Sequence, residues 1–393
     1  MAFSQQRGRP TRGRGSDRTP QASDRRIQRA REEGQRGRKR LVFFFGAMVL
    51  LAIAGVTIGL WYTQFYSPPR VNAAFINDTR FNQGDVVKRV RMIQAAQGYT
   101  ASSISLTDIL RVLYNPDLDV SAGPFRLGMV QMELLKQGAA EYGISVTEEE
   151  IDGSVRAVFT PTVPEGQIAT PDQIEREFKE QYQGYLNFNR ISDSDYRRLT
   201  EEQMYFFRMR SALGANLPTE KEHVEVSWLR TPLRPDPSLG DPERWQDLTA
   251  ISERLESEEF EIVAQEFSAA FRFADPNGYV GWVPRGAFPK LDVRLFGDEQ
   301  IEALAIGEVS EAWESSGYLY FMEIANGPEV LEVSDDWTER LKDMALQRWL
   351  EDRFEQGTSE GWLGIKYDSE IYAWAAEQLR QTAQQNRGES RGS

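Results

Sequence analysis

The chain has 393 residues, 27% of them charged, with a formal net charge of −14, one histidine and no cysteine. The lack of cysteine excludes disulfides, thiol catalysis and a lipid-modified cysteine. The acidic balance argues against nucleic acid as a partner, because phosphate contacts need Lys and Arg. Without a second histidine, a thiol or a phosphate-binding glycine loop, the sequence predicts no metal and no cofactor.

The first 40 residues form a basic tail rich in Arg, Gly, Gln and Ser, with 13 Lys and Arg against four Asp and Glu. Such a composition cannot bury enough apolar surface to fold, so residues 1–40 are predicted to be disordered. Contact with RNA or anionic lipid is one interpretation of the charge. A topology signal for the segment that follows is the favoured one.

A stretch without any charged side chain follows, and we predict a transmembrane helix over residues 41–63. A helix of this length reaches roughly 30 Å, the thickness of the hydrocarbon layer. The basic flank places the N-terminus in the cytoplasm and the bulk of the chain outside a cell membrane that it crosses once. Cleavage after Ala73, in the small-residue pattern Val71-Asn72-Ala73, is the alternative. The apolar run exceeds the roughly 7–15 residues of the apolar region of a signal peptide, so an uncleaved anchor is favoured.

Residues 71–220 show a mostly helical pattern. Apolar residues recur at helical spacing from Asp85 to Gln97. Thr147 begins a capping box with Glu150, and Thr170 precedes a proline at a first helical position. The sequence therefore predicts a helical domain here.

Residues 221–328 change to a mixed pattern. His223 to Leu229 alternates as a strand, and helices are predicted from Asp241, after a cap at Ser257 and over 291–296. The turn Ser315-Ser316-Gly317 between two extended halves predicts a hairpin. Together these elements predict an α+β domain of roughly 100 residues with a small antiparallel sheet.

The last part of the chain, residues 329–379, is predicted to be helical again. Ser334 caps a long helix that ends near Gln356-Gly357, and a short amphipathic helix follows. The polar tail at 380–393 is predicted to be disordered.

Four motifs in order carry a resemblance to a known family: HVEVSWLRT, EFEIVAQEFS, NGYVGWVPRG and LAIGEVSEAWESSGYLYFMEI. In the order and spacing of these four motifs, residues 223–326 resemble a parvulin-type (PpiC) peptidyl-prolyl isomerase domain. Residues 71–220, with the helix that returns at 334–356, resemble the helical chaperone domain of the SurA and PrsA foldases. The resemblance implies an α+β fold whose C-terminal helix packs back on the helical domain. It also implies unfolded or nascent exported polypeptides as partners.

Parvulins are credited with a polar cluster of two histidines and a Cys or Asp behind the prolyl-binding cup. In this chain those three positions fall on Trp228, Ala270 and Leu319, so the polar members are replaced. His223, the one histidine, lies five residues before the expected place and is predicted to be a surface residue. Isomerase activity is therefore implied by the resemblance and questioned by these residues.

The apolar cup remains as the candidate substrate site. Its predicted residues, which are all apolar or aromatic, are Trp228, Trp282, Phe288, Leu291, Phe296, Leu319 and Phe321. The alternative is that these side chains are domain core. An apolar groove without the polar cluster can still bind proline or unfolded segments.

Three functions remain in competition. The first is a membrane-anchored extracytoplasmic folding factor or holding chaperone. The second is an active prolyl isomerase, against which the three replacements count. The third is a structural or interaction protein of a membrane complex that uses an inactive parvulin fold.

Overall fold

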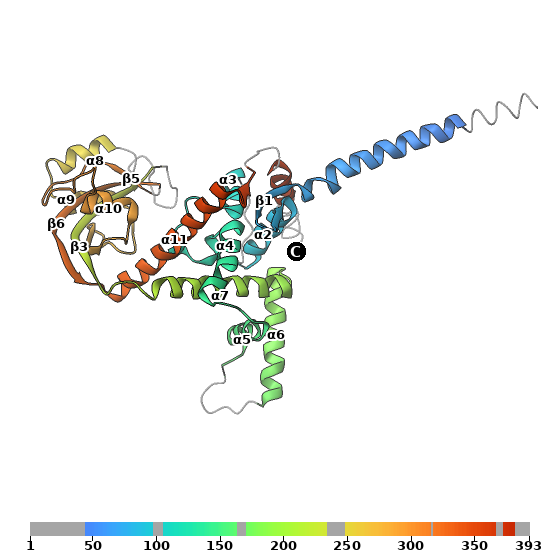
Figure 1. The fold of residues 1–393 in the computed structure, drawn as a ribbon, viewed down its shortest axis with the longest axis horizontal. Helices are drawn as coiled ribbons and strands as arrows, with labels where there is room; N and C mark the ends of the chain where they lie inside the picture. Colours follow the sequence, from blue (N-terminus) through green and yellow to red (C-terminus); the bar gives the residue numbers. More distant parts are fainter. Residues whose placement is uncertain are drawn as a thin grey trace, which may run out of the picture. The chain divides into compact units, whose positions relative to one another are not determined.

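The structure is a computed structural model. It describes residues 44–96, 105–162, 170–233, 248–315, 317–366 and 372–381. The chain divides into two compact units, Met1–Ser67 and Pro68–Ser393 (Figure 1). The predicted basic tail at 1–40, the helix start at Asp241 and the tail beyond residue 381 lie outside the described residues.

The described part of the first unit contains the helix Phe44–Tyr66, with a mean hydropathy of 2.2 and no buried residue in its apolar window. The hydroxyls of Thr57 and Thr63 donate to the carbonyls of Ile53 and Gly59, so neither needs a partner outside the helix. A core helix of a soluble protein would bury one face. By length and composition this helix is able to cross a membrane, a test that a signal sequence near the N-terminus also passes.

The helical lobe consists of the described residues of 68–214 and 335–381. Its N-terminal helices are α2 (Gln83–Ala96), α3 (Leu106–Leu113), α4 (Met129–Ala139), α5 (Glu148–Phe159), α6 (Pro171–Asn189) and α7 (Asp193–Gly214). The predicted caps are confirmed, because the hydroxyls of Thr147 and Thr170 accept the N–H groups of the third helical residues. Short 3-10 turns, among them η3 (Val120–Ala122), connect α3 to α4.

A three-stranded antiparallel sheet in this lobe was not predicted. Its order is β2 (Thr79–Asn82), β1 (Asn72–Ile76) and β7 (Leu363–Ile365), so it joins the beginning of the lobe to its end. Three to five residues are too few for the alternating pattern that identifies a strand in sequence.

The sheet lobe, residues 220–332, is built on a four-stranded antiparallel sheet of order β4-β3-β6-β5. The strands are β3 (Glu220–Pro232), β4 (Tyr279–Pro284), β5 (Trp313–Ser315) and β6 (Tyr318–Glu332), and the helices are α8 (Leu248–Leu255), α9 (Phe260–Phe267) and α10 (Pro289–Phe296). The predicted α+β class and the hairpin of β5 and β6 are confirmed. The predicted cap at Ser257 is wrong: Glu259 precedes α9, and the Ser257 hydroxyl donates to the Glu253 carbonyl.

The longest helix of the second unit's described residues is α11 (Asp335–Glu360), capped by Ser334 as predicted. It lies against α7 and α4 (Figure 1), so the predicted return to the helical domain is confirmed. It ends at Gly361 in a left-handed conformation, slightly later than predicted. Its first turns also pack on the sheet lobe through Trp337 and Leu341, and α11 therefore connects the two lobes.

Candidate functional site

The four-stranded sheet has two faces, and the register of β3 and β6 decides which side chains share one. Trp228 pairs with Met322, and Leu229 pairs with Phe321. The face of Trp228 packs in one core with α10, whereas the face of Leu229 packs in another with α8 and α9. We call these the α10 face and the α9 face.

The predicted site residues are divided between these faces. Trp228, Phe288, Leu291 and Phe296 pack together in the core of the α10 face. Phe321 lies in the core of the α9 face, and Leu319, two residues before it on β6, pairs with Thr231.

Leu319 therefore lies on the opposite face from Trp228, although both were predicted at positions of one polar cluster. A shift of one residue along a strand moves a side chain to the opposite face of the sheet. On the α10 face β6 instead presents Tyr318 and Tyr320. Trp282 also lies away from that core, with its ring beside Gly327.

The position of the predicted cup is filled by the chain's own aromatic rings. Phe288 has ring centroids at 5.1 Å from Trp228, 5.8 Å from Phe271, and 5.9 Å from both Phe273 and Trp337. Trp337 of α11 also stacks on Phe273 at 4.8 Å. Only 8% of Phe288 and none of Trp228 is exposed. These five rings pack together in the core of the α10 face, and Phe271 and Phe288 also border a neighbouring cleft.

Trp228 cannot replace the proton chemistry of a histidine. Its indole is a hydrogen-bond donor only. Among the described residues, its N–H has no acceptor. The base of the predicted cup is thus an apolar contact rather than a polar relay.

A cleft of about 420 Å³ opens beside this cluster, and its walls come from both lobes. The sheet lobe contributes Arg230 on β3, Tyr320 on β6 and Leu291 on α10, while the helical lobe contributes α11 and the segment Pro116–Asp119. Its floor is aromatic and apolar and its rim is charged. Such a combination is typical of a ligand-binding site.

Arg230 is held rigidly in the cleft wall. Its guanidinium lies 4.4 Å from the ring centroid of Phe271 and 4.3 Å from that of Tyr318. Its Nη2 donates to the carbonyl of Ala270 at 2.6 Å, so Ala270, a predicted polar position, takes part only through its backbone. Burial raises the pKa of the neighbouring Tyr320, against the effect of Arg230. Tyr320 therefore remains protonated at neutral pH and cannot act as a general base there.

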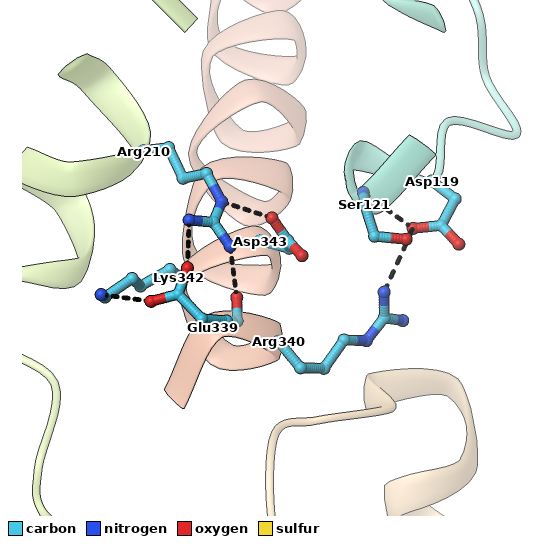
Figure 2. Close-up of polar contacts among 7 residues, drawn as sticks. All are labelled: Asp119, Ser121, Arg210, Glu339, Arg340, Lys342 and Asp343. Atoms are coloured by element: carbon cyan, nitrogen blue, oxygen red, sulfur yellow. Dashed lines mark hydrogen bonds and ion pairs between the residues drawn. The ribbon is translucent and has the colours of Figure 1, made fainter. Parts of the chain in front are cut away.

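Arg340 of α11 closes one side of the cleft (Figure 2). Its Nη1 donates to Asp119 at 3.1 Å, its Nε donates to the Ala287 carbonyl at 3.1 Å, and its guanidinium lies 4.9 Å from the ring centroid of Phe288. Burial acts to raise the pKa of Asp119, but hydrogen bonds from Ser121 and the charge of Arg340 outweigh it and lower that pKa. Asp119 is consequently ionised, and the ion pair ties the η3 segment to α11.

The other side of α11 is fastened to α7 by Arg210. Its Nε donates to Asp343 at 2.5 Å and its Nη1 to Glu339 at 2.7 Å, while Lys342 lies 2.6 Å from Glu339 (Figure 2). Networked pairs of this kind, partly buried, hold a helix better than single surface pairs do. The α11 wall of the cleft is therefore firmly positioned.

Two titratable groups outside the cleft, His223 and Asp292, are buried or largely buried. His223 is only 2% exposed, with Nδ1 at 2.8 Å from the Lys221 carbonyl, so the prediction of a surface residue is wrong. Burial raises the pKa of Asp292 to about 6, although it accepts the Gly286 N–H at 2.7 Å. In the part of the chain that the structure describes, no group of three His, Asp or Glu side chains could hold a metal ion.

Several cleft residues escaped the sequence analysis. Arg230 and Tyr320 could have been found, because strand alternation places them on the face of Trp228. Asp119 and Arg340 could not, since they lie 221 residues apart on different elements.

No protein-family model matches the chain, and no curated protein matches it. Among solved structures, the peptidylprolyl isomerase PrsA from Bacillus anthracis is 14% identical, covering 61% of this chain and 98% of its own, with a TM-score of 0.35. The foldase PrsA from Streptococcus pneumoniae is 13% identical, covering 75% and 95%, with a TM-score of 0.27.

A SurA-like chaperone from Campylobacter jejuni is 12% identical, covering 76% of this chain and 99% of its own, with a TM-score of 0.24. The chain resembles PrsA and SurA-like foldases. These solved structures are of the same kind as the foldases that the four motifs resemble. Residue roles are taken below only from the contacts of this chain.

Proposed function

We propose that this chain is a membrane-anchored, extracytoplasmic protein-folding factor that binds unfolded polypeptide and does not catalyse prolyl isomerisation. The observation that carries the proposal is the cleft of about 420 Å³ between the sheet lobe and α11. Its apolar floor suits side chains of an extended segment, and its polar rim offers partners for the segment's backbone.

The packing around Phe288 supports binding without catalysis. Rotation about a prolyl bond faces a barrier of about 18–20 kcal/mol, and a catalyst must favour the twisted amide over the planar one. Here Trp337 and Phe273 fill the space over Phe288, and Trp228 offers no proton relay. A polypeptide in the neighbouring cleft would contact Phe288 and Leu291, two residues of the predicted cup, without a polar relay behind them.

A second hollow supports a polypeptide as the ligand. It has a volume of about 360 Å³, shares Arg340 with the first cleft, and is lined in part by Phe206, Phe207 and Phe273. Phe207 is 50% exposed, and Phe188 on α6 is 85% exposed. Exposed aromatic side chains outside a single pocket suit weak contacts with many unfolded or nascent exported chains.

The N-terminal helix supports anchoring, and β1 supports an anchor that stays attached. Phe44–Tyr66 has the length and hydropathy of a single membrane span, and the basic tail before it favours a cytoplasmic N-terminus. Ala73 is fully buried in β1, which pairs with both β2 and β7. Cleavage after Ala73 would divide the central strand of that sheet, so removal of the helix at this position is disfavoured.

The proposal is tested by the aggregation of a denatured client enzyme in the presence of the full chain in a neutral detergent. We expect the chain to suppress aggregation at a stoichiometric ratio to the client. Tyr318→Ala, in the cleft wall, should suppress aggregation less well. Tyr142→Ala, which changes an exposed tyrosine outside the cleft, should suppress it as well as the unaltered chain. If the unaltered chain neither binds the client nor delays its aggregation, the structural or interaction role in a membrane complex replaces this proposal.

A further inference from the structure

The rim of the cleft is basic, although the chain as a whole carries a net charge of −14. Four cationic side chains line the cleft: Arg230, Lys290, Arg340 and Arg348. Three carboxylates line it as well: Asp117, Asp119 and Glu351. The balance within the cleft depends on which of these charges are already paired.

Two of the three carboxylates have cationic partners. Asp119 accepts from Arg340 at 3.1 Å, which neutralises both groups. Asp117 lies 3.3 Å from Arg111, whose side chain does not line the cleft. Glu351 accepts from the amide of Gln347 at 3.0 Å. Glu351 is thus the one carboxylate of the described cleft lining without a cationic partner.

The remaining cations are not balanced. The side chains of Lys290 on α10 and Arg348 on α11 are exposed, and neither forms an ion pair within the part of the chain that the structure describes, although the charge of Arg348 acts to lower the pKa of the buried Asp292. Arg230 donates to the neutral carbonyls of Ala269 and Ala270 and also hydrogen-bonds the Tyr320 side chain, so among the described residues no carboxylate neutralises its charge. Three cations therefore face one carboxylate around an aromatic floor.

Arg230 is the best placed of the three. Its guanidinium is clamped between Phe271 and Tyr318, so little rotamer entropy is left to lose when it binds an anion. Hydrogen bonds from guanidinium to carboxylate are shorter and stronger than neutral ones. Phe288 and Leu291 lie in the same cleft and offer apolar contact to the neighbouring side chain of a ligand.

We propose that the cleft selects extended polypeptide segments in which an Asp or Glu side chain stands beside apolar residues. The inference rests on the proposed function and names the class of segment that the site prefers. The cations come from three elements, β3, α10 and α11, and are spread along the walls. This distribution fits carboxylates within a segment better than one terminal carboxylate held at a single point.

The test uses a ten-residue fluorescent peptide with a central Leu-Pro-Phe flanked by two Glu, and its matched peptide with two Gln. Fluorescence anisotropy with the full chain in neutral detergent gives the Kd of each at low salt. An exposed charge pair changes affinity about two- to fivefold, so we expect the Glu peptide to bind at least severalfold more tightly. The preference should shrink at 0.5 M salt, because screening then acts within a few ångströms.

Substitutions of the cleft cations test whether these side chains cause the preference for the Glu peptide. Lys290→Gln and Arg348→Gln should each reduce it about two- to fivefold, and the double variant should reduce it further, to what Arg230 alone supplies. Arg80→Gln is the matched control, since Arg80 is exposed on β2, lies outside the cleft and changes the net charge equally. It should leave the preference unchanged. The net negative charge of the chain by itself would disfavour the Glu peptide, so the expected result requires a local site.

The outcomes separate the two proposals. Equal binding of both peptides, unaffected by the variants, overturns the carboxylate preference and leaves the folding factor standing. A preference that is undiminished in the double variant places the recognition elsewhere and also overturns the inference. If neither peptide binds and no client is protected from aggregation, both proposals fail together.

Discussion

Replacing Phe288 with alanine distinguishes a core residue from an exposed wall of a substrate cup. Phe288 touches four aromatic rings at centroid distances of 5.1–5.9 Å and lies beneath the guanidinium of Arg340. Only 8% of it is exposed. The change would leave a void between β3, α10 and the first turns of α11.

The expected cost follows from these contacts. Truncation of a buried phenylalanine costs about 3–5 kcal/mol, the loss of transfer energy plus the cavity. Each aromatic pair contributes about 0.5–1.5 kcal/mol, so four pairs lost together agree with that range. Phe288→Leu keeps most of the volume and should cost less than about 1.5 kcal/mol.

The assay is urea unfolding of the full chain in detergent, followed by tryptophan fluorescence, with Trp228 and Trp337 as reporters in the cluster. With a slope of about 2–3 kcal/mol per molar urea, Phe288→Ala should lower the midpoint by about 1–2 M. Phe207→Ala, on a 50% exposed ring, serves as the control and should change the free energy of unfolding by less than about 1 kcal/mol. A Phe288→Ala variant as stable as the unaltered chain that no longer binds peptide would refute the filled cup.

Three further predictions concern other parts of the chain. The pKa of Asp292 in the folded protein, about 6, lies above the ordinary value of 3.8, so the ionised carboxylate destabilises the fold. The free energy of unfolding should therefore fall by at most about 3 kcal/mol as the pH rises from about 4 through 6. Unfolding curves of Asp292→Asn should lack this loss. Arg89→Met leaves the buried Glu202 with only Arg198 as a partner and should lower the free energy of unfolding by about 3 kcal/mol in thermal or urea unfolding. The double variant Arg89→Met with Glu202→Leu should recover most of this loss. A single variant as stable as the unaltered chain would contradict the buried pair. Mass spectrometry of the membrane-bound chain should find residues before Phe44 still attached, whereas a mature chain beginning at residue 74 would contradict the uncleaved anchor.

Local patterns in the sequence were sufficient for much of the fold. The caps at Thr147, Thr170 and Ser334 depend on a side chain and a backbone group three residues away, so the sequence alone identifies them. The hairpin of β5 and β6 depends on one short turn. The α+β class follows from the succession of such elements.

Pairings over long distances in the chain could not be predicted. β1 and β7 are separated by nearly the whole second unit, and each is too short to show a pattern of its own. Leu319 illustrates a second limit, because the face of a strand residue depends on register and a motif aligned one residue away gives the wrong face. The Arg340–Asp119 pair and the ring of Trp337 over Phe273 depend on how α11 crosses two lobes, which no local signal encodes.

The central claim is that this chain binds polypeptide beside a filled cup and does not accelerate prolyl isomerisation. NMR exchange spectroscopy of the cis and trans forms of a short Leu-Pro peptide, with increasing amounts of the full chain, tests it directly. We expect resonance shifts from binding and an exchange rate no faster than that of the free peptide. An exchange rate that rises in proportion to the protein, and falls again in Tyr320→Phe, would contradict it and restore the isomerase.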